Sequence, residues 1–414
     1  MKVLVLNQYA GNKGDRAVAY FVMRALAQAG VDRITLSTHD RNLWKGDDAI
    51  TRFKVHMVPW GWNVESFNPR RRMDWERHRF MRHFGFPWLR NRLLQKKDLG
   101  LSKWICSREY MRAVEDADAI ISTGGHILTT RFAEDCIVEM VYDLMMVAVM
   151  QKSFVLWSQT IGPFQFKDIR NKDAVKMILT SAKSVFIRDK NSFDACRSMG
   201  MSENKIKFTF ESVIGLNDEI SVYVPPSQRE NVLGITVYNA EKRTADEYNQ
   251  YIESMAHIAD YASSLEMRVR FFPHEIRGAV LDDRQCISDI IGRMKRKNYA
   301  EIFDEDVTTV KHLGEVARCQ AFIAHKTHSV IFALTVGTPV VAIAYHPKTI
   351  DFMSQYNLSE NCLLEQDISN HSLIKHLNMV LNNADEIGKK QWEQSCYLGS
   401  KVREDFSEML HLFS

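Results

Sequence analysis

The chain alternates short, almost wholly apolar runs with longer segments whose apolar residues recur at helical spacing, and this alternation limits its fold more than any other feature. A continuous apolar run is typical of a strand in a parallel sheet, because helices cover such a sheet on both faces. In the first half of the chain, strands are predicted at residues 3–6, 33–37, 119–122, 154–158 and 185–188. Helical patterns are found at 15–29, 137–151 and 189–199. We therefore expect an α/β protein with a Rossmann-like first domain.

A second alternating series follows in the other half of the chain. Its strands are predicted at 232–237, 268–272, 321–324 and 340–344, and its helices at 245–265 and 282–297. A chain of 414 residues is too long for one hydrophobic core, so two domains are expected. The boundaries place the first domain at 1–216, a turn-rich linker at 217–230 and a second Rossmann-like domain at 231–414. The last helical patterns, 369–382 and 385–411, fit either a cover for the second domain or a return to the first.

Composition favours a cytoplasmic protein over a secreted or membrane-spanning one. The seven cysteines include no C-x-x-C pair, which argues against a disulfide framework or a structural zinc site and is typical of a reducing compartment. Met1 leads directly into an apolar strand without a secretory signal pattern. The longest apolar stretch, 137–150, contains Glu139 and Asp143 and is too short to span a bilayer. We expect a cytoplasmic protein.

The most informative junction between a strand and a helix carries three basic side chains. His325, Lys326 and His328 directly follow the apolar run 321–324, and a helical pattern begins at once. The first turn of a helix presents unpaired N–H groups, and open α/β sheets bind ligands beyond the carboxyl ends of their strands. We therefore expect an anion site here. The alternative is that His328 caps the helix and Lys326 is solvated.

Three predicted strands of the first half end in polar, glycine-containing loops, which together would form a binding cleft. The loops are Asn12-Lys13-Gly14-Asp15, Gly124-Gly125-His126 and Gln159-Thr160-Ile161-Gly162. None has the spacing of a dinucleotide fingerprint or a P-loop. Asp15 is a candidate general base, with the role of a helix N-cap as the alternative.

A further polar cluster follows the predicted strand at 268–272. His274 and Glu275 could bind sugar hydroxyls or transfer protons, and the alternative is an ordinary loop histidine beside solvated acids. The spacing of His274, Glu275 and Asp282 matches no metal motif. We expect no metal and no cofactor.

Six blocks of sequence, spread over about residues 1–355, together resemble the polysaccharide pyruvyl transferase family. They are Asn12-Lys13-Gly14-Asp15-Arg16-Ala17, Gly124-Gly125, Gln159-Thr160-Ile161-Gly162-Pro163, Ile187-Arg188-Asp189-Lys190-Asn191-Ser192, Lys326-Thr327-His328 and Tyr345-His346-Pro347-Lys348. The resemblance implies two domains similar to the GT-B glycosyltransferases, with the active site in the interdomain cleft. It also implies a transferase that moves a pyruvyl group from phosphoenolpyruvate to two hydroxyls of a sugar, forming a cyclic ketal and releasing phosphate.

The resemblance maps donor binding onto Arg188, Lys326 and His328 in this chain. We add Gly124 and Gly125, whose backbone can approach a ligand closely. Lys326 departs from the family pattern, where arginine is usual, and lysine lacks the planar fork that suits carboxylate and phosphate. Arg16 is a second departure, since an acidic residue commonly follows the Gly-Asp pair.

The proposed chemistry requires an acid that protonates the donor and a base that activates a hydroxyl. Histidine titrates near neutral pH, so His328 is the first candidate acid, with Asp15 as the base and His274 as a further catalytic candidate. Asn12, Gln159 and Glu275 are the candidate acceptor-binding residues. Alanine variants of Arg188 and Lys326 are expected to weaken donor binding without unfolding the protein, if both side chains are exposed in a cleft.

Residues 60–105 form a predicted insertion that is rich in tryptophan and basic residues. The segment contains five of the eight tryptophans and eleven Lys or Arg against four Asp or Glu. Such a mixture favours an anionic membrane surface, which suits an acceptor carried on a lipid during exopolysaccharide or capsule assembly. Nucleic-acid binding is the less favoured alternative. A third interpretation is a helical insertion whose tryptophans pack on the first domain.

Two other functions fit the same fold. A nucleotide-sugar glycosyltransferase of GT-B architecture would use the same strand-end loops, and a non-catalytic glycan or nucleic-acid binding protein could retain them. The sequence leaves the oligomeric state and the acceptor sugar open.

Overall fold

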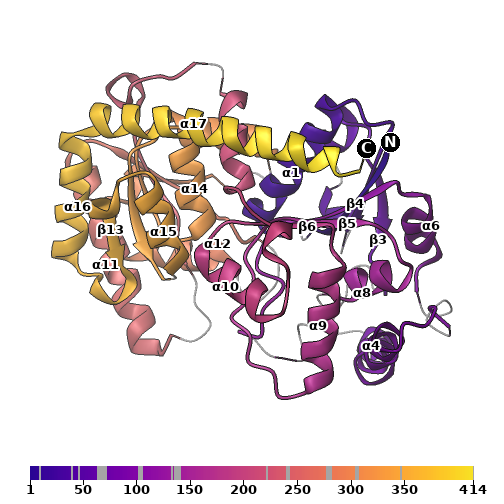
Figure 1. The fold of residues 1–414 in the computed structure, drawn as a ribbon. Coiled ribbons are helices and arrows are strands. Elements are labelled where there is room, and N and C mark those ends of the chain that lie inside the picture. Colours follow the sequence, from indigo (N-terminus) through magenta and orange to yellow (C-terminus); the bar gives the residue numbers. More distant parts are fainter. Residues whose placement is uncertain are drawn as a thin grey trace. The chain divides into compact units, whose positions relative to one another are not determined.

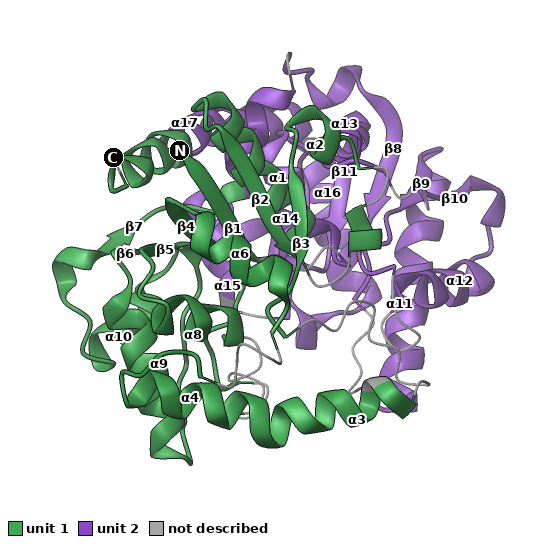
Figure 2. Cartoon of the chain, turned by 90° about the vertical axis from the view of Figure 1, so that its right-hand side faces the viewer, with its two compact units in different colours: residues 1–10, 15–212, 401–414 green, residues 11–14, 213–400 purple. Residues whose placement is uncertain are grey.

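A computed structural model describes residues 1–8, 11–38, 41–44, 47–62, 72–100, 106–131, 134, 141–220, 222–238, 243–276, 282–303, 307–345 and 347–413. The chain forms two compact units (Figure 2). Unit 1 contains residues 1–10, 15–212 and 401–414, and unit 2 contains residues 11–14 and 213–400. Each unit is an α/β layer structure built on one parallel sheet, so the predicted fold class is confirmed.

The sheet of unit 1 has seven parallel strands in the order β3-β2-β1-β4-β5-β6-β7. The strands are β1 (Lys2–Gln8), β2 (Arg33–Thr38), β3 (His56–Pro59), β4 (Ala119–Thr123), β5 (Phe154–Gln159), β6 (Ser184–Ile187) and β7 (Ile206–Phe208). Every residue of β4, β5 and β6 is buried, as expected for central strands of a covered parallel sheet.

Helices connect these strands. The described helices are α1 (Lys13–Gln28), η1 (Arg41–Trp44), α2 (Asp48–Arg52), α3 (Arg72–Phe80), η2 (Met81–Gly85), α4 (Phe86–Leu94), α6 (Arg108–Asp116), α8 (Tyr142–Val149), α9 (Ile169–Ser181), α10 (Lys190–Ser198) and η3 (Glu203–Lys205). After β7, η4 (Ser212–Glu219) begins unit 2, which contains all of its residues except the first. Of the helix predicted at 137–151, residues 137–140 lie outside the described residues and the rest contains α8.

Unit 2 has a six-stranded parallel sheet in the order β10-β9-β8-β11-β12-β13. Its strands are β8 (Glu230–Ile235), β9 (Arg268–Phe271), β10 (Ala300–Ile302), β11 (Cys319–Ala324), β12 (Val340–Ala344) and β13 (Cys362–Leu364). Its helices are η5 (Pro226–Gln228), α11 (Ala245–Ser264), α12 (Asp283–Arg293), η6 (Lys297–Tyr299), α13 (Thr309–Arg318), α14 (Thr327–Thr335), α15 (Pro347–Gln355), η7 (Ser359–Asn361), η8 (Glu365–Asp367), α16 (Asn370–Asn382) and α17 (Ala384–His411). The helix predicted at 282–297 ends earlier, at Arg293.

The sequence left open whether the last helix covers the second domain or returns to the first. Most of α17 belongs to unit 2, but its last turns belong to unit 1. Figure 1 shows α17 as one long helix that ends near the chain terminus. Within unit 1, the ring of Phe406 packs edge-on against Trp157 of β5, with centroids 4.9 Å apart. Asp405 also accepts a hydrogen bond from Thr209, at 2.8 Å. Residues 401–414, which were predicted to be part of the second domain, therefore belong to unit 1.

The basic aromatic insertion divides into packed and exposed parts. Trp62 is buried and Trp60 packs against the same hydrophobic core, as the packing alternative predicts for these two rings. Helices α3, η2 and α4 run without interruption from residue 72 to 94, and Trp75 and Trp88 are exposed there. Trp104 lies outside the described residues. In the segments that the structure describes, no helix has the length and hydropathy needed to cross a bilayer.

Candidate functional site

In unit 1, the strand-end loops meet at the side chain of Arg188, the residue after β6. Its Nη2 donates to Thr160 Oγ1 at 2.9 Å and to the carbonyl of Gly125 at 3.3 Å. Its other terminal nitrogen, Nη1, forms an ion pair with Glu211, which follows β7. Carboxyl ends of parallel strands lie at one edge of a sheet, which explains why residues distant in sequence gather here.

Burial governs the electrostatics of this arginine. Only 6% of the Arg188 side chain is exposed, and only 1% of Glu211. Burial lowers the pKa of Arg188 to about 10, while the carboxylates of Asp189 and Asp15 act in the opposite direction. The guanidinium therefore remains charged at neutral pH. The influence of Asp15 on this pKa places the candidate base within electrostatic reach of the candidate donor-binding arginine.

The loop after β4 requires glycine. Gly124 and Gly125 have φ values of +57° and +76°, in the left-handed region that residues with a Cβ rarely adopt. A Cβ on Gly124 would also lie 2.6 Å from Cγ1 of Val18, so α1 packs directly on this loop. The backbone geometry that allows a close approach to a ligand is thus present at both positions.

The predicted acceptor residue Gln159 is fully buried. Its amide Nε2 donates to the carbonyl of Ser122 at 3.3 Å, which ties the end of β5 to β4. Arg16, the second departure from the family pattern, is also buried and donates to the carbonyl of Leu43 at 3.3 Å. Its Nε lies 3.9 Å from the carboxylate of Asp47. Arg16 therefore anchors the segment after β2.

In unit 2, the strand-to-helix junction has the predicted form, because β11 ends at Ala324 and α14 begins at Thr327. Lys326 occupies the N-cap position, and its Nζ donates to both oxygens of Asp283 at 2.8 Å. Asp283, the first residue of α12, also accepts the backbone N–H groups of His274 at 2.9 Å and Glu275 at 2.8 Å. The alternative of a solvated Lys326 is therefore wrong. An alanine variant of Lys326 was expected to fold normally because its side chain was assumed to be exposed. Since only 13% of that side chain is exposed, the expectation no longer has a basis.

His328 lies in the first turn of α14, against the backbone of Gly14. A Cβ on Gly14 would overlap the imidazole ring of His328. Both residues belong to unit 2, because residues 11–14 pack with that unit. The structure thus brings the first and the fifth sequence blocks together, and a glycine is required where they touch.

Asn12 holds this segment in place. Its Oδ1 accepts the N–H of Gly14 at 2.8 Å, which caps α1, and its Nδ2 donates to Oε2 of Glu275 at 3.2 Å. The N-cap role considered for Asp15 therefore belongs to Asn12, and Asp15 lies inside the first turn. Two predicted acceptor residues, Asn12 and Glu275, are in direct contact.

His274 is buried in a cluster of basic side chains. Burial lowers the pKa of His274 well below its usual value, and His312, Lys326, Lys13 and His328 lower it further. Neither ring nitrogen of His274 has a hydrogen-bond partner among the described residues. A neutral imidazole with two lysines near it, Lys13 and Lys326, indicates a basic region that can attract anions.

Three charged residues of the site were not predicted from the sequence: Glu211 and Asp283, whose carboxylates pair with the two predicted cations, and Lys13, a member of the basic cluster. Glu211 follows β7, a strand that the sequence did not predict. Asp283 was visible beside Asp282, but nothing in the sequence showed its pairing with a lysine 43 residues later. Lys13 was inside a recognised block, and its Nζ lies 5.8 Å from the ring centre of Phe303. Asp282 caps α12 and pairs with Arg284, so its carboxylate already has a structural partner.

Comparison with solved structures shows that the fold is one used by sugar-nucleotide enzymes. The Staphylococcus aureus MnaA–UDP structure matches with a TM-score of 0.60 over 100% of this chain and 98% of that chain, at 9% identity. Neisseria meningitidis UDP-GlcNAc 2-epimerase matches with a TM-score of 0.59 over 99% of each, at 10% identity. Both support a GT-B-like fold and, at this identity, the fold alone.

Sequence comparison is more specific. Amylovoran biosynthesis protein AmsJ of Erwinia amylovora is 21% identical over 98% of this chain and 99% of its own length. The model of the polysaccharide pyruvyl transferase family matches residues 12–347, a range that begins at the cap of α1 and includes Arg188, Lys326 and His328. The resemblance drawn from the six blocks is confirmed, and the chain belongs to the polysaccharide pyruvyl transferase family.

Proposed function

We propose that this protein transfers a pyruvyl group from phosphoenolpyruvate to two hydroxyls of a sugar in an exopolysaccharide or in its lipid-linked precursor. The observation that supports this most strongly is the family match over residues 12–347. The relative AmsJ is named for the biosynthesis of amylovoran, which supports a glycan acceptor. The basic cluster around His274 adds a physical reason, since phosphoenolpyruvate carries both a phosphate and a carboxylate.

We propose that the donor is bound by Arg188, Lys326 and His328, with the N–H groups of Gly124 and Gly125 as further donors of hydrogen bonds. The pairing of Arg188 with Glu211 and of Lys326 with Asp283 fixes both cations in position before a ligand arrives. His328 lies in the first turn of α14, where the positive end of the helix dipole favours an anion.

The proposed reaction moves two hydroxyl protons and one phosphate group. A proton is added to the methylene carbon of the donor, which becomes the methyl group, and one sugar oxygen bonds to the neighbouring carbon. The bond from that carbon to the phosphate oxygen then breaks, and the second sugar oxygen takes its place. Of the two hydroxyl protons, one balances the proton added to carbon and the other leaves with phosphate. The product is a cyclic ketal.

We assign proton donation to His328 and hydroxyl activation to Asp15. His274 was a further catalytic candidate from the sequence, but its lowered pKa keeps the imidazole neutral at neutral pH, so it lacks the acidic proton of an imidazolium. We propose that His274 supports the cluster as a neutral imidazole. Asn12 and Glu275, which already share a hydrogen bond, are the proposed acceptor contacts. Gln159 is buried, so we propose that it acts through the shape of its loop.

The test is phosphate release that requires both phosphoenolpyruvate and an acceptor, measured across glycans that contain galactose, glucose, mannose or their N-acetylated forms. The product is identified by the mass of a pyruvate ketal. His328→Gln is expected to lower kcat by about 100-fold or more, because general acid catalysis contributes about 100- to 10,000-fold. Consumption of a nucleotide sugar, with no response to phosphoenolpyruvate, would instead support the glycosyltransferase alternative.

We also propose a peripheral membrane contact through the continuous helix formed by α3, η2 and α4. Large apolar side chains are exposed along it at Met73, Trp75, Phe80, Phe84 and Trp88. Exposed arginines lie between them at 77, 79 and 82, and Arg72 directly precedes Met73. Exposed aromatic rings beside cationic groups favour an anionic lipid surface.

Liposome flotation tests this contact. The wild-type protein is expected to float with vesicles that contain phosphatidylglycerol at low salt, and to float less at high salt. A Trp75→Ala, Phe84→Ala double variant is expected to remain at the bottom of the gradient. Val222→Ala, which removes an exposed apolar side chain from unit 2, is the control and should float normally. Failure of the wild-type protein to float would exclude the proposal.

A further inference from the structure

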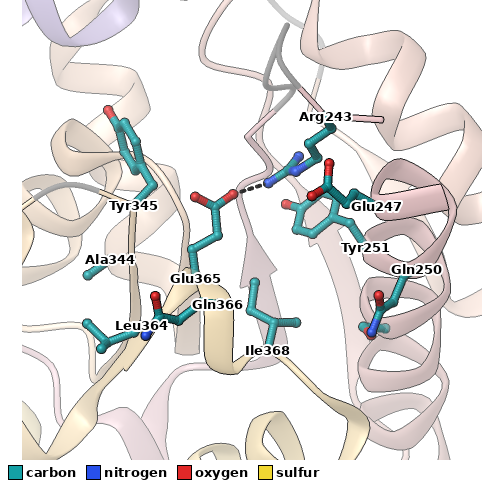
Figure 3. Close-up of a pocket in the computed structure, with 11 residues that line it drawn as sticks. Arg243, Glu247, Gln250, Tyr251, Ala344, Tyr345, Leu364, Glu365, Gln366 and Ile368 are labelled. Carbon is teal, nitrogen blue, oxygen red and sulfur yellow. Dashed lines mark hydrogen bonds and ion pairs between the residues drawn. The ribbon is translucent and has the colours of Figure 1, made fainter. Parts of the chain in front are cut away.

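Unit 2 contains a cavity of about 680 Å³ that the proposed donor-binding residues do not line (Figure 3). Its walls come from the amino-terminal half of α11, the end of β12 and the segment after β13. The polar and aromatic side chains that line it include Arg243, Gln250, Tyr251, Tyr345, Glu365 and Gln366. Tyr345 and Glu365 follow the carboxyl ends of β12 and β13, which is where open α/β sheets bind ligands.

One wall is a rigid polar network. Arg243 forms an ion pair with Glu365, and its guanidinium lies over the ring of Tyr251, 4.0 Å from the ring centre. The hydroxyl of Tyr251 lies 2.9 Å from Nδ1 of the buried His325, whose Nε2 is 3.6 Å from Oε1 of Glu365. Polar groups that already hold one another in place lose little entropy when they bind a ligand.

The network also connects the cavity to the basic junction. His325 immediately precedes Lys326 in the loop between β11 and α14. Burial lowers the pKa of His325 well below its usual value, so the imidazole is neutral at neutral pH and fits between a phenol and a carboxylate without adding charge. His325 therefore joins the polar wall of the cavity to the loop that carries Lys326 of the proposed donor site.

The opposite wall is aromatic. Tyr345, which follows β12, lines the cavity, and its ring stacks on that of Tyr238 with centroids 4.2 Å apart and planes inclined by 28°. A supported tyrosine ring offers a flat apolar surface with a polar edge. Such a surface fits the C–H face of a pyranose ring.

Charge decides which class of ligand suits the cavity. The lining contains one arginine, Arg243, against two carboxylates, Glu247 and Glu365. A net negative lining disfavours phosphoenolpyruvate or a nucleotide diphosphate, which need surplus cations. Two amides, Gln250 and Gln366, supply both donors and acceptors, as a ligand rich in hydroxyl groups requires.

We infer that this cavity binds a neutral glycosyl residue of the acceptor glycan, and this inference rests on the proposed function. The sugar would stack on Tyr345 and exchange hydrogen bonds with Gln366 and Glu365. The cavity would then select the acceptor by a residue next to the one that is modified, while the basic cluster binds the donor.

Binding can be measured without catalysis. Saturation-transfer NMR and titration calorimetry with neutral oligosaccharides of galactose, glucose, mannose and N-acetylglucosamine would identify the sugar bound by the wild-type protein. Tyr345→Ala and Gln366→Ala are expected to weaken that binding about tenfold each, which corresponds to about 1.4 kcal/mol. Tyr397→Ala removes an exposed tyrosine from α17 in the same unit and should bind as wild type does.

In the transfer assay, the same two variants should raise the acceptor KM about tenfold and leave the KM for phosphoenolpyruvate within about twofold of wild type. Wild-type transfer with unchanged acceptor KM in both variants would overturn the inference and leave the proposed function intact. Glycan binding that needs Tyr345, in a protein that never uses phosphoenolpyruvate, would support the cavity assignment and refute the proposed function. Binding of UDP in the cavity in place of any neutral glycan would overturn the inference.

Discussion

Lys326→Met should destabilise the protein strongly, although lysine substitutions on a protein surface usually do little. Only 13% of the Lys326 side chain and 1% of the Asp283 side chain are exposed. The lysine supplies two of the four hydrogen bonds that Asp283 accepts, and the other two come from backbone N–H groups of residues 274 and 275. Methionine keeps the length of the side chain but leaves a buried carboxylate without its counter-ion.

The magnitude follows from the cost of an unpaired buried charge. Removing one partner of a buried ion pair typically costs about 3–5 kcal/mol, a large part of the roughly 5–15 kcal/mol that stabilises a folded protein. Adding Asp283→Asn to Lys326→Met should recover most of this loss. The amide is neutral, and its carbonyl oxygen can still accept the N–H groups of residues 274 and 275. The double variant should therefore be more stable than either single variant.

Urea unfolding followed by tryptophan fluorescence measures these differences, with each transition fitted separately if the two units unfold apart. Lys389→Met is the matched control, because this lysine is 71% exposed on α17 and lies 3.9 Å from Glu393. The control should change the free energy of unfolding by less than about 0.5 kcal/mol. The reasoning is refuted if Lys326→Met behaves like the control, or if the losses of the two single variants simply add in the double variant.

Two further predictions concern Gly14 and the buried histidines. Gly14→Ala should displace the ring of His328 and lower kcat. The control is Gly314→Ala within α13, where a Cβ would have no atom within 4 Å; it should leave kcat unchanged and add about 0.5–1 kcal/mol of stability. Steady-state kinetics and thermal unfolding measure these effects. Burial lowers the pKa values of His274 and His325 in the folded protein, so below about pH 6.5 these histidines bind protons more readily in the unfolded chain. The free energy of unfolding should therefore be highest above about pH 6.5 and fall below it by up to about 1.4 kcal/mol per pH unit for each histidine. Urea midpoints between pH 7.5 and 5.5 measure this slope, and His325→Gln should reduce it; a slope unchanged by that substitution would contradict the assignment.

The central strands could be predicted from the sequence, and the edge strands could not. Strands buried on both faces, such as β5 and β12, are continuous apolar runs that need no structural context to recognise. The four edge strands were all missed. They are β3, β7, β10 and β13, each with three or four residues and at least one exposed position. An edge strand has a neighbour on one side only, so its sequence pattern is weak, and its pairing depends on the strand beside it.

The candidate site shows the same division between local and distant information. Lys326, His328 and the glycine loops were identified because each closely follows a predicted strand, which is a local pattern. The burial of Lys326 and Arg188 was not predicted, because it depends on Asp283 and Glu211, which reach these two cations only in the folded chain. The contact between Gly14 and His328 joins residues more than 300 positions apart, and no periodicity in the sequence could indicate it.

Each unit thus uses the same device at the carboxyl edge of its sheet: a cation that follows a strand is held by a buried carboxylate. Arg188 is held by Glu211 in unit 1, and Lys326 by Asp283 in unit 2. The pairing fixes the direction in which each cation donates, but it cancels most of the net charge that would attract an anionic donor. Part of that attraction must then come from the first turn of α14, where the positive end of the helix dipole and the N–H groups favour an anion whatever the charge of the neighbouring side chains.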